Sequence, residues 1–444
     1  MKTVKQVFWG FLIILSAIWL MTDPIDWASL SGVFAWRNIL NQYTGILGIG
    51  VMSLAMILSA RPVFLEKHFH GLDKMYRLHK WLGISGLALS IGHWLIVNAP
   101  KWMVAWGWLE RGARKPRPIF PDGSLQQIFM DQRGLAEGIG EWAFYLAALL
   151  MVLALIKNFP YRRFFQTHRV LALTYLALVF HSVILVKFDY WSGFLGVMLA
   201  GLMAAGSVAA VMSLLRIRLG TSTVKGKVIG LEHQPALNAL SVEIQLDEGW
   251  RGHESGQFAF VTFHAEEGPH PFTIASHSNA DGRIRFLIKA LGDYTKTLPD
   301  RLHVGDCIKI EGPYGRFNFE SDTPRQIWIG GGIGITPFIA RMKELSKQPN
   351  GKTVHLFHTT ADYDQTAIDK LMSDAAEANV KLDVRWDKRD GRLDLDSLVK
   401  AVPDWRNADV WFCGPAGFGR VLREGLVRLG FPEQRFHQEL FDMR

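Results

Sequence analysis

The stretch that decides the fold is YRLHKWLGISGLALSIGHWLIV, residues 76–97, which is long and apolar but has a histidine near each end. About 20 consecutive apolar residues suffice for a helix to cross a bilayer. His79 and His93 lie 14 residues apart within this segment. Because an ionisable ring inside a membrane is costly without a partner, the two histidines indicate a functional site within a membrane span.

A second apolar stretch, THRVLALTYLALVFHSV at residues 167–183, contains His168 and His181, which are 13 residues apart. At about 1.5 Å per residue, each pair of histidines is separated by about 20 Å along its helix. If both helices run outward from the cytoplasm, His79 is level with His168 and His93 with His181. Two imidazoles at each of two depths predict two metal centres, and haem suits a flat apolar slot between helices. The alternative, histidines hydrogen-bonded across helices or lining a proton path, is disfavoured by four matched positions.

The 13-residue step raises a geometric requirement. A step of 14 residues returns to within about 40° of the same helix face, whereas 13 residues miss it by about 140°. The helix that contains His168 and His181 is therefore predicted to have a π-bulge or kink between them, or to meet its two haems from different sides.

Six apolar segments precede residue 216, and their approximate ranges are 7–21, 44–60, 78–98, 139–156, 168–187 and 191–215. The first has no suitable signal-peptide cleavage site and is predicted to be a retained anchor. Positive residues gather in alternate loops: Arg61, Lys67, Lys74, Arg77 and Lys80, then Lys157, Arg162, Arg163 and Arg169, then Arg216 and Arg218. The positive-inside rule then predicts that both termini are cytoplasmic. The loop 99–138 is also basic although this topology makes it external.

Composition excludes two other classes of protein. The net charge of +8 is concentrated beside apolar segments, which argues against a nucleic-acid partner. Only two cysteines are present, Cys307 and Cys413, so a disulfide framework is not expected.

In the second half of the chain, polar and apolar residues alternate as they do in ordinary soluble proteins. Short alternating stretches at 225–232, 239–246, 257–263 and 283–289 predict an antiparallel β-barrel. From about residue 325, strands, glycine loops and helices alternate, which predicts a parallel-sheet α/β domain.

Two motifs in the predicted barrel suit a flavin. In HPFTIAS (270–276), the Phe272 ring can lie against a flavin, and Thr273 can hydrogen-bond its polar edge. In IKALGDYT (288–295), the Lys289 side chain, the Gly292 backbone and the Thr295 hydroxyl suit a pyrophosphate.

The stretch GGGIGITP (330–337) lies between a predicted strand and helix and suits a dinucleotide. Its glycines allow close approach to phosphate, Thr336 can cap the helix, and Pro337 suits the first helical turn. The helix N-terminus would then receive the pyrophosphate. A later strand ends in Cys413-Gly414-Pro415, where Cys413 could equally be a plain buried thiol.

Taken together, these motifs resemble the ferric reductase and NADPH oxidase superfamily, and most closely its compact bacterial oxidases. The resemblance rests on the paired histidines, HPFTIAS, GPYG (312–315), GGIGITP and CGP, and covers nearly the whole chain. It implies a six-helix transmembrane haem domain (1–219), then an antiparallel β-barrel FAD domain (220–322) and an α/β parallel-sheet nucleotide-binding domain (323–444).

By this resemblance, His79 with His168 would hold an inner b-type haem, and His93 with His181 an outer one. The FAD-binding residues would be His270, Pro271, Phe272, Thr273, Ile274 and Ser276, with Lys289, Gly292 and Thr295. The dinucleotide-binding residues would be Gly331, Gly332, Gly334, Ile335, Thr336, Pro337, Cys413, Gly414 and Pro415. Cys413 and Thr273, with Phe441 near the C-terminus, would lie where nicotinamide and flavin react.

The resemblance also implies a function in the bacterial inner membrane, with the FAD and nucleotide domains cytoplasmic. Electrons would pass from NAD(P)H through FAD and two haems to an acceptor outside, most simply O2 giving superoxide. Two alternatives stay open: a ferric-chelate reductase, and an electron-donor module that feeds a quinone or a partner protein. NADPH is the predicted donor, with NADH tolerated, because Thr359, Thr360, Lys388, Arg389 and Arg392 could bind a 2′-phosphate. The oligomeric state is not indicated.

Overall fold

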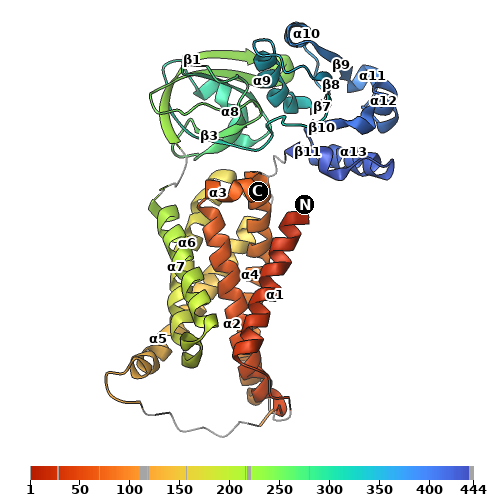
Figure 1. Ribbon diagram of the computed structural model, residues 1–444. Helices are drawn as coiled ribbons and strands as arrows, with labels where there is room; N and C mark the ends of the chain where they lie inside the picture. Colours follow the sequence, from red (N-terminus) through yellow and green to blue (C-terminus); the bar gives the residue numbers. More distant parts are fainter. Residues whose placement is uncertain are drawn as a thin grey trace. The chain divides into compact units, whose positions relative to one another are not determined.

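The computed structural model describes residues 2–439 except 28–29, 70, 111–117, 119, 157, 216, 218–221 and 280. The described chain divides into two compact units. One unit contains the long apolar helices, and the other contains both β-sheets together with the segment Phe64–Asp73 (Figure 1).

Among the described residues, six helices are long and apolar enough to cross a membrane. They are α1 (Lys2–Thr22), α2 (Gly32–Ser59), α4 (Leu72–Ala105), α5 (Leu125–Leu155), α6 (Tyr161–Leu185) and α7 (Phe194–Leu215). Each overlaps one predicted apolar segment, so the prediction of six membrane helices is confirmed. A 3-10 turn, η1 (Phe188–Ser192), separates α6 from α7.

Small residues allow close contacts between these helices. A Cβ atom added to Gly206 of α7 would lie 2.2 Å from the hydroxyl oxygen of Tyr175 on α6. One added to Gly50 of α2 would lie 2.5 Å from a methyl group of Leu15 on α1. The Tyr175 hydroxyl also hydrogen-bonds Ser53 Oγ of α2 at 2.8 Å. Small residues and interhelical hydrogen bonds are the usual sources of helix association in lipid, where apolar burial contributes little.

The short helix α3 (Val63–Phe69) follows α2, and most of it is grouped with the second unit. Its Glu66 is 4% exposed, and its carboxylate accepts a hydrogen bond from the Gly315 backbone N–H at 2.7 Å. This contact was not predicted from the sequence.

The antiparallel sheet of the second unit is a nearly closed barrel. Its strands are β1 (Ser222–Gln234), β2 (Ala239–Leu246), β3 (Phe258–Thr262), β4 (His270–Thr273), β5 (Arg283–Lys289) and β6 (Cys307–Tyr314). They lie in the order β4-β3-β6-β1-β2-β5, and a single bridge between Ile274 and Phe286 joins the two ends. A 3-10 turn, η2 (Pro235–Leu237), connects β1 to β2, and helix α8 (Asp293–Arg301) follows β5. The predicted antiparallel barrel is confirmed.

The second sheet is parallel, as predicted. Its strands are β7 (Arg325–Gly331), β8 (Thr353–Thr360), β9 (Val380–Trp386), β10 (Ala408–Cys413) and β11 (Phe436–Glu439). Their order is β11-β10-β7-β8-β9, so the order reverses between β7 and β10. The intervening elements are η3 (Gly332–Ile335), α9 (Thr336–Leu345), α10 (Gln365–Glu377), α11 (Asp387–Asp390), α12 (Leu395–Ala401), η4 (Trp405–Asn407), α13 (Ala416–Arg428) and η5 (Glu433–Arg435).

Alternation along β7 explains why both faces of the parallel sheet are covered. Trp328 packs with Phe338 of α9 on one face, while Ile327 and Ile329 pack with Leu422 of α13 on the other. Buried parallel strands of this kind are apolar on both sides. The carboxyl ends of β7 and β10 therefore form the switch point, which is where open α/β sheets bind their ligands.

Candidate functional site

The structure brings together the histidines that the sequence paired. The ring centroids of His79 on α4 and His168 on α6 are 5.9 Å apart, and those of His93 and His181 are 6.4 Å apart. A metal ion midway between two imidazoles, about 2.0–2.1 Å from each ring nitrogen, would place the ring centroids about 6 Å apart. Both pairs therefore have the separation that a single bound ion requires.

Hydrogen bonds from the other ring nitrogen orient three of these rings. His79 Nδ1 lies 2.9 Å from Ala55 O, and His181 Nδ1 lies 2.9 Å from Ala136 O. His93 Nδ1 lies 3.0 Å from Thr44 Oγ1. Because Thr44 donates its own proton to Leu40 O at 2.6 Å, His93 Nδ1–H is the donor. Such bonds leave Nε2 unprotonated, as metal-binding histidines need.

The fourth ring, His168, is held by packing. Its Nδ1 is buried without a hydrogen-bond partner among the described atoms. The Phe164 ring stacks on it, with centroids 5.0 Å apart and planes 24° apart. The four histidines thus form two pairs, and each pair offers two ring nitrogens to one metal ion. This arrangement fits two bis-histidine haems.

A glycine makes room for one of these rings. A Cβ atom added to Gly140 of α5 would lie 1.9 Å from His181 Nδ1, which is far inside van der Waals contact. The sequence analysis missed Gly140, although its place in the glycine-containing stretch EGIGEW within a membrane span is a usable signal.

Helix α6 is α-helical from Tyr161 to Leu185, with no π segment between His168 and His181. The prediction of a π-bulge there is therefore wrong. Both rings still meet their partners on α4, and the other expectation, that two positions about 140° apart reach their haems from different sides of the helix, stays a prediction.

The residues of the HPFTIAS motif lie at the edge of the barrel. Thr273 is buried and pairs with Phe258 of β3, which in turn pairs with Tyr314 of β6. Phe272 is half-buried, stacks on His270 and packs against the barrel core. The Ser276 hydroxyl accepts a hydrogen bond from the Arg285 backbone N–H at 3.1 Å. The FAD assignment of His270, Pro271, Phe272, Thr273, Ile274 and Ser276 stays a prediction.

The candidate pyrophosphate residues already have partners within the chain. Lys289 forms an ion pair with Asp362 in which Nζ and Oδ2 are 2.6 Å apart. Gly292 is the N-cap of α8, and its backbone N–H donates to Thr295 Oγ1 at 3.0 Å. The Thr295 hydroxyl thus stabilises the start of α8, whose N-terminus is the part suited to an anion.

The glycine loop packs directly on the CGP motif, as the sequence analysis expected of one site. A Cβ atom on Gly334 would lie 2.1 Å from Cys413 O, and one on Gly331 would lie 2.9 Å from Pro415 Cδ. Only glycines permit this approach, which lies at the switch point between β7 and β10. Buried His358 of β8 supports the same loop, since its Nδ1 lies 3.2 Å from Gly330 O. Burial lowers the pKa of His358 to about 4, so the ring stays neutral near pH 7.

One detail of the loop differs from the prediction. Thr336 is the first residue of α9 rather than its cap, and its hydroxyl donates to Ile333 O at 2.7 Å. Ile335 occupies the N-cap position, and Pro337 lies in the first turn as predicted. The 3-10 turn η3 precedes α9, so the helix begins one residue earlier than predicted. A glycine-rich sequence alone does not predict such a turn.

Cys413 is fully buried at the end of β10. Burial raises the pKa of its thiol well above the ordinary value, and Glu439 beside it acts in the same direction. The side chain is therefore a neutral thiol, whether or not a nicotinamide lies next to it. Phe441, the third residue predicted to take part in the reaction, lies outside the described residues, as do Lys157, Arg216 and Arg218.

The residues considered for a 2′-phosphate lie near carboxylates. Thr359 donates to the Asp387 carboxylate oxygen Oδ1 at 3.1 Å, whereas Thr360 donates to the backbone carbonyl oxygen of Asp362 at 2.6 Å. Arg389 bonds Asp390 through two nitrogens, at 2.8 and 3.0 Å. Arg392 Nε lies 3.8 Å from Asp387 Oδ2. Asp387 and Asp390 therefore offset part of the positive charge that a 2′-phosphate would meet.

Comparison with known proteins gives separate matches for the two halves. Residues 44–179 match the family described as ferric reductase like transmembrane component, and residues 237–319 match the oxidoreductase FAD-binding domain. The first match contains His79, His93 and His168 and ends two residues before His181, and the second contains HPFTIAS.

Curated relatives match only part of the chain. A flavohemoprotein of Bordetella pertussis is 26% identical over 42% of this chain and 52% of its own length. The reductase subunit of stachydrine N-demethylase from Rhizobium meliloti is 27% identical, over 43% of this chain and 58% of its own. NADH-cytochrome b5 reductase 2 of Meyerozyma guilliermondii is 30% identical over 37% of this chain and 60% of its own length. The chain thus spans little more than half the length of these relatives.

Among solved structures, flavohemoglobin from Malassezia yamatoensis is similar with a TM-score of 0.48 and 18% identity, covering 92% of this chain and 97% of that one. The Amycolatopsis cytochrome P450 reductase GcoB gives a TM-score of 0.44 and 23% identity, and the match covers 50% of this chain and 70% of that one. The family matches are the decisive comparison. A ferric-reductase-like transmembrane domain followed by an oxidoreductase FAD-binding domain is the combination that matches the ferric reductase and NADPH oxidase superfamily.

Proposed function

We propose that this protein is a transmembrane flavocytochrome that passes electrons from cytoplasmic NAD(P)H through FAD and two b-type haems to O2 at the outer face, giving superoxide. The observation that carries the proposal is the pair of imidazole clamps, with ring separations of 5.9 and 6.4 Å. When bound, FAD converts the hydride pair of NAD(P)H into single electrons and the haems pass them on.

The chain's own residues position these groups and do no acid–base chemistry. His79 with His168 and His93 with His181 would each hold one haem, which would supply single-electron transfer when bound. In the second unit, Gly331 and Gly334 allow the loop after β7 to pack closely on the end of β10, where the dinucleotide would bind. In this proposal Thr273 would hydrogen-bond the flavin edge, and the buried, neutral thiol of Cys413 would form part of the wall beside the nicotinamide.

The proposed location is the bacterial inner membrane, with both termini and the reductase domains cytoplasmic. The basic residues beside α2, α4 and α6 support this orientation through the positive-inside rule. They include Arg61, Lys74 and Arg163.

For the electron donor we propose NADPH, with NADH also accepted. Lys388, Arg389 and Arg392 provide positive charge near the end of β9, while Asp387 and Asp390 offset most of it. One net positive charge favours a 2′-phosphate only weakly. A preference for NADH of more than a hundredfold in kcat/KM would contradict this assignment.

The test uses the purified full chain loaded with haem and FAD. NADPH is expected to reduce the haems, and cytochrome c reduction in air is expected to be abolished by superoxide dismutase. Iron-chelate reduction at the same rate without oxygen would favour a ferric reductase. Electron delivery only to an added partner would favour a donor module. A five-coordinate, high-spin spectrum of the reduced protein would contradict the imidazole clamps.

A further inference from the structure

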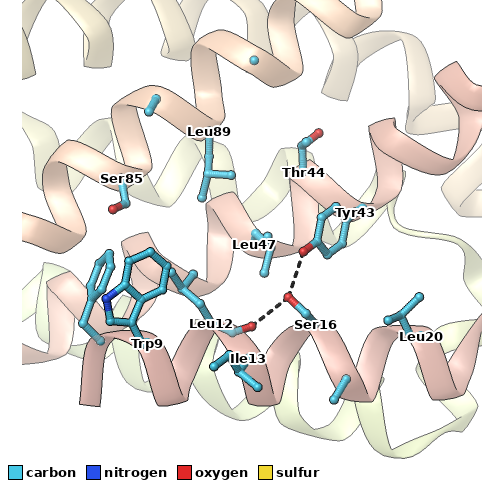
Figure 2. A pocket seen from close by; sticks show the side chains of 14 residues that line it. Trp9, Leu12, Ile13, Ser16, Leu20, Tyr43, Thr44, Leu47, Ser85 and Leu89 are labelled. Atoms are coloured by element: carbon cyan, nitrogen blue, oxygen red, sulfur yellow. Dashed lines mark hydrogen bonds between the residues drawn. The ribbon is translucent and has the colours of Figure 1, made fainter. Parts of the chain in front are cut away.

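A groove on the membrane unit is separate from the haem clamps. It encloses about 730 Å³ between α1, α2 and α4, within the range of about 300–1,000 Å³ of small-molecule sites. Its walls are mostly apolar and include Leu12 of α1, Leu47 of α2 and Leu89 of α4 (Figure 2).

The groove does not coincide with the face of α4 that presents the histidines. It is lined on α4 by Ser85, Ala88, Leu89 and Gly92. At 100° per residue, these positions lie on average about 90° around the helix from His93. The groove therefore flanks the candidate outer haem slot instead of being part of the ligand face.

One wall of the groove nevertheless touches the outer haem ligand. Thr44 lines the groove, and its Oγ1 accepts the hydrogen bond from His93 Nδ1 at 3.0 Å. Gly92, the residue before His93, lines it as well. An occupant of the groove would thus lie within a few ångströms of the imidazole through which the outer haem is held.

The groove also contains a pair of hydrogen-bonded hydroxyl groups. A site that binds only a lipid chain does not need such polar groups. Ser16 of α1 and Tyr43 of α2 face each other, with their oxygens 2.9 Å apart (Figure 2). Ser16 donates to Leu12 O at 2.8 Å, so the Tyr43 hydroxyl is the donor in the pair. A carbonyl in the groove could take that donor over. The rings of Trp9 and Tyr43 offer flat walls for an aromatic or quinoid ring.

We propose that this groove binds a membrane-soluble quinone, as a second electron acceptor beside the outer haem. A quinone combines the features the groove matches: a flat ring, carbonyl acceptors for a hydroxyl, and an apolar tail that extends into lipid. The net reaction is NAD(P)H + H⁺ + quinone → NAD(P)⁺ + quinol, in which the hydride supplies two electrons and protons come from water. This inference rests on the proposed electron path for its reducing power, but the binding step does not.

The experiment measures binding, using the full haem- and FAD-loaded protein in phosphatidylcholine nanodiscs. The probe is an azido-ubiquinone, which is photolysed and located by peptide mass spectrometry, with decylubiquinone as competitor. We expect label on peptides of α1, α2 or α4 within residues 8–20, 43–47 or 85–92. The Ala88→Phe variant fills the groove from an exposed position and is expected to raise the competitor concentration for half-displacement more than tenfold.

Matched variants separate this effect from a general disturbance. Ala200→Phe on α7 makes the same change at another exposed membrane position and is expected to leave labelling unchanged. Tyr43→Phe removes only the donor and is expected to weaken binding about five- to tenfold. The haem spectrum is the check that each variant is folded.

Three results would overturn the proposal. The first is that the photolabel is found outside these peptides, and the second is that the Ala88→Phe variant is labelled as strongly as the wild type. The third is that oleate displaces the probe as readily as decylubiquinone does, which would identify the groove as a binding site for a lipid chain. If NADPH fails to reduce the haems in the same sample, the proposed function fails, while the labelling result still decides the binding site.

Discussion

Partners of the second ring nitrogen orient three of the four candidate haem histidines. His79 and His93 are both oriented by residues of α2, Ala55 and Thr44, whereas His181 is oriented by Ala136 of α5. Two of these partners are backbone carbonyls, which leave no side-chain signature. The sequence therefore predicts the histidine ligands but not the backbone groups that orient their rings.

At this scale the sharpest prediction concerns Gly140. Gly140→Ala would force a methyl group to within 1.9 Å of His181 Nδ1, so the ring must move out of its clamp. We expect the purified variant to hold one haem per chain in place of two, measured as the pyridine haemochrome against protein concentration. Gly138→Ala is the control, because a Cβ there meets nothing within 4 Å. Equal haem content in both variants would argue against the clamp at His181.

Glu66 allows a prediction about pH. Burial raises the pKa of Glu66 above its ordinary value of 4.5, although the hydrogen bond from Gly315 opposes the rise. The folded state therefore holds the proton to higher pH than the unfolded chain, and stability falls as pH rises between the two pKa values. Glu66→Gln keeps an acceptor for the Gly315 N–H and removes the titration.

We expect Glu66→Gln to abolish that part of the pH dependence and to match or exceed the wild-type stability at pH 7. Glu66→Ala leaves the buried N–H without its acceptor and should cost about 1–3 kcal/mol. Thermal release of FAD, followed by flavin fluorescence from pH 4 to 8, measures both effects. A steeper pH dependence in the Gln variant than in the wild type would contradict the assignment.

At the scale of elements, periodicity predicted most of the fold. Six apolar runs predicted six membrane helices, and alternation at 239–246 and 283–289 predicted strands β2 and β5. The errors arose where a local contact decides geometry. Helix α6 is uninterrupted because side chains 140° apart can reach two neighbouring slots, and α9 begins at Thr336 because η3 precedes it. The short helix α3 was missed because seven residues contain too little periodic signal.

The contact between the glycine loop and β10 predicts the effect of Gly334→Ala. The new methyl group would lie 2.1 Å from Cys413 O, so η3 and the end of β10 must separate. Since FAD motifs lie on other strands, we expect FAD content to stay unchanged and KM for NADPH to rise at least tenfold. Gly417→Ala on α13, where a Cβ meets nothing within 4 Å, serves as the control. Loss of FAD together with dinucleotide binding would show that the variant misfolds more widely.

At the scale of the whole molecule, two kinds of signal identify the two halves. The membrane half is recognised from composition and from four histidines, and the reductase half from short motifs at strand ends. The three curated relatives described above each match 43% of the chain or less, so none of them describes the combination.

The orientation of the whole chain is testable with cysteine reporters. In a Cys307→Ser background, Asp122→Cys places a thiol before α5, and Ser346→Cys places one after α9; both positions are exposed. We expect a membrane-impermeant maleimide to label intact cells at position 122 and to label position 346 only after lysis. Labelling with the opposite pattern would reverse the proposed direction of electron flow.

The 14-residue spacing on α4 has a consequence for the energetics of the cell. His79 and His93 are separated by about 21 Å along the helix, which is about two thirds of a bilayer core about 30 Å thick. In the proposed orientation, each electron that moves between these levels carries negative charge outward. A membrane potential, negative inside, favours that movement by up to about 2.3 kcal/mol per 100 mV for full crossing. Turnover would therefore be accelerated by the potential and would also dissipate it, unless other charges move in compensation.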